Sequence, residues 1–364
     1  MKTDAARCEP QNALFLYCRA GFESECAQEI QHRAAEKEIA GYAQTNPTSG
    51  YVLFHCYGDG AAAELYKSIS LNDLIFARQW FVARAQCADL ARDDRVTPLI
   101  NTIKQFSMRF HDWFIDTPDS EATKPLTALC RGIGQAMRQA LTKAGATIDQ
   151  PEHGPRLHIC FVATDRAYVG VGTADGSAPW PMGIPRLKAS PEAPSRSALK
   201  LEEALLRFVS EEKMQPGMHA VDLGAAPGGW TWVLMRRHVR VIAVDNGKIA
   251  PALLESGLVQ HQATDAFKFQ PAHQKDWMVC DVVEQPIRNA ELAAHWLREG
   301  WCRYAIVNLK LPMKKRFQEV LRCLEHIHSS CAEAGVSVQL HCKQLYHDRE
   351  EVTLYAERVS SRRV

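Results

Sequence analysis

One stretch of small residues could bind a nucleoside ligand. Residues 219–237 read HAVDLGAAPGGWTWVLMRR, which predicts a short strand, a glycine-rich turn and a helix. Glycine adopts unusual φ values and lets a ligand approach the backbone, and open α/β sheets bind ligands at the carboxyl ends of their strands. A phosphate-binding loop would need Gly-Lys-Ser/Thr, but Trp230 follows the last glycine. A dinucleotide fold would need GxGxxG, whereas the spacing from Gly224 to Gly229 is GxxxGG with Pro227 inside it.

Acidic residues at strand ends favour S-adenosylmethionine (SAM) as that ligand. SAM carries no phosphate, and its sulfonium, amino-acid tail and ribose diol all suit carboxylates. Asp245 ends a second predicted strand about 20 residues past the turn, where an acid can hold a ribose diol. Asp265 follows a third predicted strand and could face the adenine amino group, and Asp281 ends a fourth. A single strand-end Asp is more often a helix cap or a turn residue, but several in register with a DxGxxPGG turn indicate SAM.

Two lysines, Lys200 and Lys310, suit the activation of a hydroxyl group. Lys310 ends a predicted apolar strand, where a charge is costly unless it has a partner or a role; taken alone, it could equally be a solvated strand-end charge. A neutral sugar hydroxyl is a poor nucleophile, and a lysine could accept its proton if a second lysine and burial lowered its pKa. Asp281 and Glu351 could balance the charge and orient the base. Methylation of an exocyclic nitrogen is not indicated, because the fourth strand ends in CDVVE instead of an NPPY-type or DPPY-type motif.

The elements that must position these residues fall into two regions. Residues 1–173 read as a mixed α+β region that begins with a βαββ unit. Residues 174–196 are rich in Pro, Gly and Ser and are the best linker candidate. From residue 197 onwards helices and strands alternate, which predicts an α/β domain with a parallel, doubly wound sheet. A chain of 364 residues has room for about two domains.

Composition excludes several classes of protein. The formal net charge is +1, so the chain is not a generally basic nucleic-acid coat, and any RNA contact must come from local patches. We expect no signal peptide and no membrane span. The twelve cysteines form no CxxC pair, which predicts reduced thiols in a cytoplasmic protein without a metal site. No apolar interaction stripe is evident, which favours a monomer.

Candidate RNA contacts are basic or aromatic side chains. The N-terminal basic residues could also form an ordinary solvated helix face, and the aromatic residues are more often core than base-stacking groups. The candidates are Lys314, Lys315 and Arg316 beside Lys310, Arg186 and Lys188 in the linker, Arg131, Arg138 and Lys143 on one predicted helix, and Phe76, Trp80 and Phe81.

The array Lys200, Asp281, Lys310, Glu351 resembles the K-D-K-E tetrad of the FtsJ-like ribose 2′-O-methyltransferases. The closer likeness is to the bacterial branch that acts on large-subunit ribosomal RNA. It rests on strings along nearly the whole chain: LYCRAGFESECA, FARQWF, PMGIPRLKASPEAPSRSALKLEEA, VDLGAAPGGWTW, WMVCDVVE, NLKLPMKKR and QLYHDREEVT. The resemblance implies SAM-dependent methylation of the ribose 2′-oxygen of a cytidine in 23S rRNA.

The resemblance also implies a domain plan and residue roles. The plan is a ferredoxin-like part at residues 1–90, a THUMP-type RNA-binding part at 91–173, a linker at 174–196 and a Rossmann-like methyltransferase domain at 197–364. Lys310 would accept the proton, and Lys200, Asp281 and Glu351 would complete the catalytic group. The residues implied to bind SAM are Ser197, Ala226, Pro227, Gly228, Gly229, Asp245, Asp265 and Asp281.

Two alternatives remain open on sequence grounds. The same tetrad would serve a ribose methyltransferase for tRNA or another rRNA site, and an RNA-binding assembly factor could keep the SAM fold without activity. A nucleotide inside structured RNA has to be splayed out to reach such a pocket. We therefore expect free or partly assembled 23S rRNA, rather than the finished subunit, to be the substrate.

Overall fold

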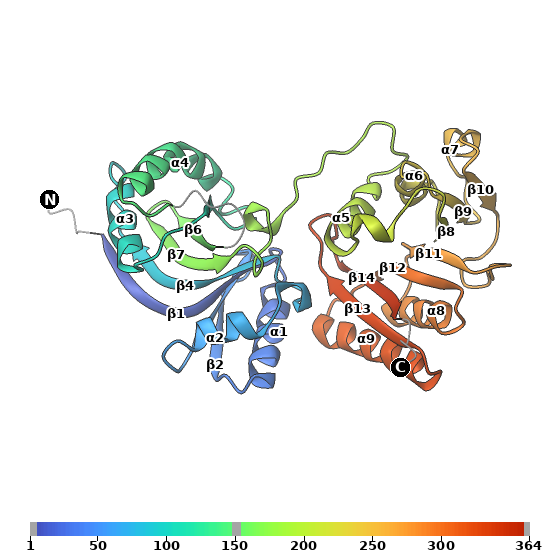
Figure 1. Ribbon diagram of the computed structural model, residues 1–364, viewed down its shortest axis with the longest axis horizontal. Coiled ribbons are helices and arrows are strands. Elements are labelled where there is room, and N and C mark those ends of the chain that lie inside the picture. The colour runs from blue at the N-terminus through green and yellow to red at the C-terminus, as the bar shows by residue number, and fades with distance from the viewer. Residues whose placement is uncertain (1–5, 148–153, 360–364) are drawn as a thin grey trace. The chain divides into compact units, whose positions relative to one another are not determined.

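The computed structural model describes residues 6–147 and 154–359, and the chain divides into two compact units between Ile184 and Pro185 (Figure 1). The division falls inside the proline-rich segment predicted as a linker. The first part of that segment packs within the N-terminal unit, where Arg156 Nη1 donates to Ser177 Oγ and to the Ala178 carbonyl, each at 2.9 Å. None of the helices in the described ranges is long and apolar enough to cross a lipid bilayer.

The N-terminal unit is built on one continuous sheet in the order β2-β3-β1-β4-β7-β6-β5. The βαββ unit at the start forms as predicted, and a further mixture of helices and strands follows it, so the mixed α+β prediction is confirmed. The elements are β1 (Arg7–Tyr17), α1 (Glu23–Glu36), β2 (Gly41–Thr45), β3 (Tyr51–Cys56), α2 (Ala61–Ser68), η1 (Leu71–Asp73), β4 (Gln79–Ala88), α3 (Val96–Gln105), β5 (Asp112–Asp116), α4 (Leu126–Lys143), β6 (Pro155–Ala163), β7 (Arg166–Thr173) and η2 (Pro181–Gly183).

Antiparallel pairing of β4 with β7 joins the ferredoxin-like part to the part that follows it. Both parts therefore share one sheet. The aromatic candidates of this region are core residues: Phe76, Trp80 and Phe81 are all fully buried, which leaves them no free face for a base. Phe81 stacks on Phe15 at a ring-centroid distance of 5.0 Å.

The expectation that every cysteine is a reduced thiol is wrong at one pair. Cys8 on β1 and Cys87 on β4 are direct partners in the antiparallel register and are joined by a disulfide. The two residues are 79 positions apart in sequence, so only the strand register brings them together. The ten other cysteines of the described chain are free and buried.

The C-terminal unit is an α/β layer in the sheet order β10-β9-β8-β11-β12-β14-β13. Its elements are α5 (Ala198–Phe208), η3 (Glu211–Lys213), β8 (His219–Leu223), α6 (Gly229–Met235), β9 (Arg240–Val244), α7 (Pro251–Glu255), β10 (Val259–Gln262), β11 (Lys275–Cys280), α8 (Pro286–Arg298), β12 (Cys302–Lys310), α9 (Arg316–Glu333), β13 (Ser337–Lys343) and β14 (Glu351–Val359). Strands β8 to β12 pair in parallel, which confirms the Rossmann-like prediction.

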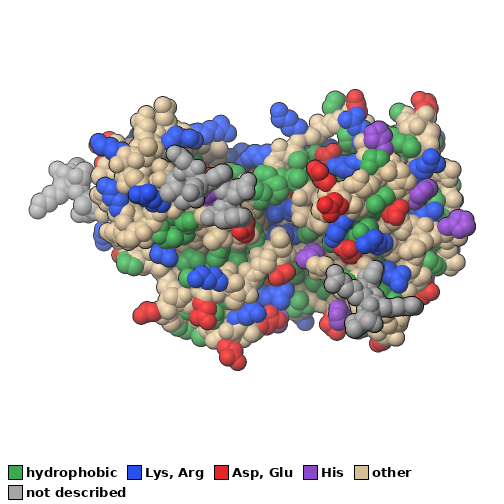
Figure 2. Space-filling view, in the orientation of Figure 1, with side chains coloured by type: hydrophobic (Ala, Val, Ile, Leu, Met, Phe, Trp, Pro, Cys, Tyr) green, Lys and Arg blue, Asp and Glu red, His purple; other side chains and the backbone are tan. Residues whose placement is uncertain are grey.

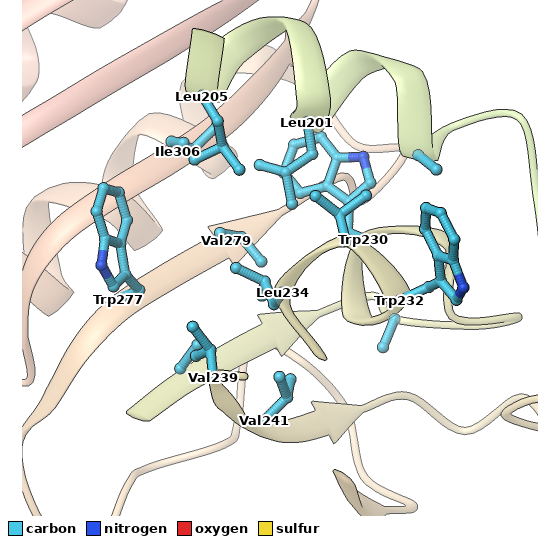
Figure 3. Packing of buried hydrophobic residues seen from close by; sticks show 14 of the residues in the cluster. Leu201, Leu205, Trp230, Trp232, Leu234, Val239, Val241, Trp277, Val279 and Ile306 are labelled. Carbon is cyan, nitrogen blue, oxygen red and sulfur yellow. The ribbon is translucent and has the colours of Figure 1, made fainter. Parts of the chain in front are cut away.

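The last two strands depart from a wholly parallel sheet. β14 pairs antiparallel with both β12 and β13, because β13 follows α9 and then turns back as a hairpin. Figure 1 shows α5 and α6 on one side of this sheet and α8 and α9 on the other. Figure 3 shows the first of these layers, where Leu201 and Leu205 of α5 and Trp230 and Leu234 of α6 pack over the strands.

Burial of this apolar layer fixes α5 and α6 on the sheet, since each large apolar side chain that leaves water contributes about 1.5–3 kcal/mol. The carboxyl ends of β8, β9, β11 and β12 consequently meet at one edge, with the first turns of α5 and α6 above them. The predicted site residues lie along this edge.

Candidate active site

The turn between β8 and α6 is built from residues that come very close to their neighbours. Gly224 has a φ of +77°, and a Cβ there would lie 2.5 Å from Val282 Cγ2. A Cβ at Gly229 would lie 2.5 Å from the hydroxyl oxygens of both Ser195 and Ser197. The glycines therefore hold the turn against the residue that follows Asp281 on one side and against the start of α5 on the other.

Two further residues of the turn, Pro227 and Gly228, tie it to the start of α7 and to its side chains. Gly228 has a φ of +114°, and a Cβ there would lie 2.3 Å from Leu253 Cδ1. The carbonyl of Pro227 accepts a hydrogen bond from Ala250 N at 3.0 Å. Only glycine adopts this backbone conformation without strain, so the bare backbone predicted from the sequence is a requirement of the fold.

Asp245 follows β9 and braces the same turn. Its Oδ2 accepts from Ala226 N at 3.0 Å, and its Oδ1 accepts from Gly247 N at 2.6 Å. His261 Nε2 lies 2.8 Å from the Asp245 carbonyl oxygen. Because each carboxylate oxygen has a second lone pair, Asp245 can still accept from a ribose diol while the backbone holds it in place.

Ser197 and Asp265 are the outer members of the predicted SAM set. Ser197 directly precedes α5; its carbonyl accepts from Trp230 Nε1 at 3.0 Å, and its Oγ lies 2.5 Å from Ser195 Oγ. Asp265 follows β10, and its Oδ1 accepts from Phe267 N at 2.9 Å. Ser197 is thus tied directly to the start of α6, whereas Asp265 lies at the same edge two strands away from β8.

The four residues of the predicted catalytic group form a closed ring of alternating charge. Lys200 Nζ lies 3.2 Å from Asp281 Oδ2 and 2.6 Å from Glu351 Oε1. Lys310 Nζ lies 3.1 Å from Asp281 Oδ1 and also contacts Glu351 Oε2. The Glu351 side chain is 4% exposed and that of Lys310 is 25% exposed, so the ring opens to solvent mainly at Lys310.

Strand register explains why these side chains meet. Lys310 ends β12, and its direct partner on the antiparallel strand β14 is Glu351. Asp281 follows the last residue of β11, the parallel neighbour of β12. Lys200 reaches the ring from the first turn of α5, which packs above this edge.

The charge state of Lys310 differs from the sequence-based expectation of a lowered pKa. Burial alone lowers the pKa of Lys310, but the charges of Asp281 and Glu351 and the hydrogen bonds to them outweigh burial and raise it. Two acids close to the amine outweigh one neighbouring lysine, because opposite charges favour the ammonium form. Lys310 is therefore an ammonium in the free site, and its surroundings must change before it accepts a proton.

A buried carboxylate absent from our sequence-based set holds α5 against the loop before β14. Glu203 is fully buried, and its two oxygens accept from Tyr346 N and His347 N, each at 3.0 Å. His347 Nδ1 lies 2.7 Å from Glu203 Oε2, and Arg207 Nε lies 3.4 Å from Oε1. Because Glu203 is one turn after Lys200, it fixes Lys200 relative to the loop that leads into Glu351.

The sequence analysis missed two further polar residues, Thr231 and Asn308. Thr231 Oγ1 donates to Asp222 Oδ2 at 2.6 Å, and burial raises the pKa of Asp222 to about 7. Asn308 Nδ2 donates to Asp281 Oδ1 at 2.9 Å. A signal for Asn308 was present, since it is two residues before Lys310 and alternate residues of a strand share a face.

The basic candidates for RNA contact lie in both units. Lys314 and Lys315 are exposed in the segment between Lys310 and α9, and Arg316 pairs with Glu350. In the N-terminal unit, α4 carries Arg131, Arg138 and Lys143, all exposed, and no acidic residue; Arg138 also lies 5.2 Å from the Trp113 ring centre. Figure 2 shows Lys and Arg side chains over the α4 region and interspersed charges elsewhere on this face. The exposed linker residues Arg186 and Lys188 have no described contact with the ring.

Within the described ranges, no cluster of three or more His, Cys, Asp and Glu side chains could hold a metal ion.

The ring, the glycine turn and the strand-end acids form the chemical centre of the C-terminal unit. Such an edge on a Rossmann-like sheet defines a SAM-dependent methyltransferase of the FtsJ-like class. The FtsJ-like methyltransferase family profile matches residues 193–330, which include Lys200, Asp281 and Lys310.

The particular family follows from the rest of the chain. This protein belongs to the ribosomal RNA large subunit methyltransferase M family, as its sequence predicted. Proteins of that name from Xanthomonas oryzae pv. oryzae and Xanthomonas axonopodis pv. citri are 52% identical over 352 residues, which is 95% of this chain and 99% of each relative. Profiles for the ferredoxin-like domain and the N-terminal region of this family match residues 11–81 and 94–173.

A solved structure of Aeropyrum pernix fibrillarin with bound S-adenosyl-L-methionine matches more distantly. It is 17% identical, covers 54% of this chain and 81% of its own, and has a TM-score of 0.32.

Proposed function

We propose that this protein transfers a methyl group from SAM to the ribose 2′-oxygen of a cytidine in 23S rRNA. The observation that carries the proposal is the closed ring of Lys200, Asp281, Lys310 and Glu351 beside the glycine turn. The chain's membership of a family named for ribosomal RNA methylation supports the choice of substrate.

The residues around the turn fit SAM. The backbone from Ala226 to Gly229 is bare enough for close approach, and Asp245 keeps lone pairs for a ribose diol. Asp265 offers a carboxylate at the outer end of the edge, and Asp281 and Ser197 would hold the amino-acid tail. When bound, SAM supplies an electrophilic methyl group on a positively charged sulfur.

Lys310 is the residue we assign to proton removal. It is the most exposed member of the ring, so a substrate hydroxyl can reach its Nζ. Asp281 and Glu351 raise the pKa of Lys310 in the free site. The positive sulfur of SAM, when bound, would oppose this effect, because like charges disfavour the ammonium form. As the 2′-oxygen bonds to the methyl carbon and the carbon–sulfur bond breaks, the hydroxyl proton passes to Lys310.

The chain contributes mainly by alignment. Holding the hydroxyl oxygen in line with the methyl group accounts for most of the rate gain, and proton removal adds a factor on the order of 10²–10⁴. Lys200, Asp281 and Glu351 act by fixing Lys310 Nζ in one place. Basic residues at Lys314 and Lys315, and on α4 of the N-terminal unit, would contact RNA phosphates.

The target nucleotide must leave its stack to reach the ring, since Lys310 lies at a strand end with a mostly covered side chain. Free or partly assembled 23S rRNA allows this, and we propose it as the substrate in place of the finished large subunit.

The test is incubation of the protein with methyl-labelled SAM and one of three RNAs: an unmodified 23S rRNA transcript, intact 50S particles or tRNA. Digestion to nucleosides should place the label in 2′-O-methylcytidine from the transcript, with little from the other two. Label in a base-methylated nucleoside would refute ribose methylation, and preferential labelling of tRNA or of 50S particles would refute the proposed substrate.

A further inference from the structure

Behind the charge ring, a buried polar chain reaches the carboxylate of Asp281. Asn308 Nδ2 donates to Asp281 Oδ1 at 2.9 Å, and Asn308 Oδ1 lies 2.8 Å from Thr353 Oγ1. The Thr353 hydroxyl also lies 3.2 and 3.0 Å from Oδ1 and Oδ2 of Asp348. Asn308 and Thr353 are fully buried and Asp348 is 1% exposed, so bulk water does not take part in these bonds.

Strand register places Asn308 and Thr353 next to Lys310 and Glu351, the reactive pair of the ring. Asn308 on β12 and Thr353 on β14 are direct cross-strand partners, as are Lys310 and Glu351 two residues further on. Alternate residues of a strand point to the same face. The polar pair therefore lies beside the reactive pair on the same face of the sheet.

Counting hydrogens gives the direction of each bond. Asp281 accepts from the ammonium groups of Lys200 and Lys310, so it has no hydrogen to give, and Asn308 must direct its Nδ2 towards it. Asn308 Oδ1 then needs the hydrogen of the Thr353 hydroxyl, which has only one. Once that hydrogen is committed, the Thr353 oxygen can only accept. With that hydrogen on Asn308 Oδ1, which is the shortest of the three Thr353 contacts, a protonated Asp348 supplies the hydrogen for the bond between Asp348 and the Thr353 oxygen.

The surroundings of Asp348 favour the neutral acid. Burial raises the pKa of Asp348 well above its ordinary value, and the charges of Glu351 and Glu203 act in the same direction. The hydrogen bond from Leu345 N, at 2.9 Å, and the charge of Lys200 lower the pKa without outweighing the other effects.

We propose that Asp348, Thr353 and Asn308 form a positioning chain that holds Asp281 between the two lysines, with Asp348 acting as a neutral hydrogen-bond donor. These hydrogen bonds keep Asp281 Oδ1 in contact with Lys310 and leave Oδ2 to Lys200. This inference rests on the proposed function, because Asp281 matters here only as the residue that holds the proton acceptor.

Thr353 offers the sharper kinetic test. Thr353→Val keeps the side-chain shape and removes the hydroxyl; we expect kcat for methyl transfer to fall on the order of tenfold, as for a lost hydrogen bond, with KM for RNA unchanged. Thr353→Ser restores the hydroxyl and should recover kcat. The matched control is Thr102→Val, which removes a buried hydroxyl on α3 of the N-terminal unit and should leave kcat unchanged.

Asp348 tests the protonation state. Asn can donate to Thr353 and accept from Leu345 N as a neutral acid does, so Asp348→Asn should keep kcat within about threefold of the wild type, whereas Asp348→Ala should lose about as much as Thr353→Val. Wild-type kcat in Thr353→Val, or equal losses in Asp348→Asn and Asp348→Ala, would overturn the proposal. If Thr353→Val or Asp348→Ala melts below the assay temperature, kcat of Asp348→Asn is the deciding measurement. A value within about threefold of the wild type supports a neutral Asp348, and a tenfold loss overturns it.

A readout without activity separates this inference from the proposed function. A group whose pKa is raised by folding contributes stability at low pH that is lost as the pH rises above its ordinary value, here 3.8. The free energy of unfolding of the wild type should therefore fall relative to that of Asp348→Asn as the pH rises above 3.8. A difference that stays constant or grows in the wild type's favour would show Asp348 to be an anion, whatever the RNA substrate proves to be.

Discussion

Glu203→Ala should destabilise the C-terminal unit and loosen the charge ring at the same time. Glu203 is fully buried and accepts hydrogen bonds from Tyr346 N and His347 N at 3.0 Å, with Arg207 beside it. A buried donor that loses its acceptor costs about 1–3 kcal/mol, and removing one partner of a buried ion pair costs about 3–5 kcal/mol. These effects overlap, so we expect a total loss of about 3–5 kcal/mol.

Urea unfolding followed by tryptophan fluorescence measures this loss, and hydrogen exchange of a peptide covering residues 343–352 localises it. Glu203→Gln is the matched variant; it keeps one acceptor oxygen and should lose less than half as much. Because α5 also carries Lys200, kcat should fall in Glu203→Ala while SAM affinity changes little. A loss below about 0.5 kcal/mol, the usual effect of a surface substitution, together with unchanged exchange at residues 346 and 347, would refute the reasoning.

The stabilisation by Glu203 has a predictable pH dependence. Burial raises the pKa of Glu203, but the hydrogen bonds from His347 and Tyr346 and the charge of Arg207 outweigh burial and lower it. A carboxyl group with a lowered pKa contributes stability above its ordinary value of 4.5 that is lost as the pH falls through its folded value. The stability difference between the wild type and Glu203→Gln should therefore shrink below pH 4.5.

Three further predictions concern the glycine turn, the buried Asp222 and the two exposed lysines that follow β12. Gly228→Ala should cost about 1–3 kcal/mol and weaken SAM binding in calorimetry, since Gly228 has a φ of +114° and a Cβ would meet Leu253 Cδ1 at 2.3 Å; unchanged affinity would contradict this. Because the pKa of Asp222 is raised to about 7, the wild type should lose stability relative to Asp222→Asn between about pH 4 and pH 7 in urea unfolding, and a parallel pair of curves would contradict it. Replacing Lys314 and Lys315 together by Ala should lower the slope of log affinity against log salt for RNA by about 0.7–0.9 for each phosphate that is no longer neutralised, without changing SAM affinity; an unchanged slope would place RNA elsewhere.

The site was predictable where local sequence determines local structure. The strand–turn–helix at 219–237 and the acids at strand ends follow from hydrophobic patterning, since a parallel sheet gathers the carboxyl ends of its strands at one edge. The predicted position of Asp245 at a strand end is confirmed, because it directly follows the short apolar strand β9.

The rest depended on register and on charge balance, which a single sequence does not reveal. Lys310 and Glu351 are cross-strand partners, as are Asn308 and Thr353, because β14 runs antiparallel beside β12. The sequence led us to expect a parallel sheet. The pairing of Cys8 with Cys87 depends on register in the same way. The pKa of Lys310 was misjudged because the sum of two acids and one lysine depends on distances of about 3 Å and not on residue types alone.

The most direct test of proton acceptance by Lys310 is the pH dependence of single-turnover methyl transfer in the wild type and in Lys310→Arg. The wild-type rate should rise with pH, because Lys310 must lose its ammonium proton before it can act. Arg keeps the positive charge and the contacts to Asp281 and Glu351 but does not deprotonate, so Lys310→Arg should bind SAM and RNA normally with a rate lower by a factor on the order of 10²–10⁴. A Lys310→Arg rate within threefold of the wild type, or a wild-type rate that does not change with pH, would contradict the assignment.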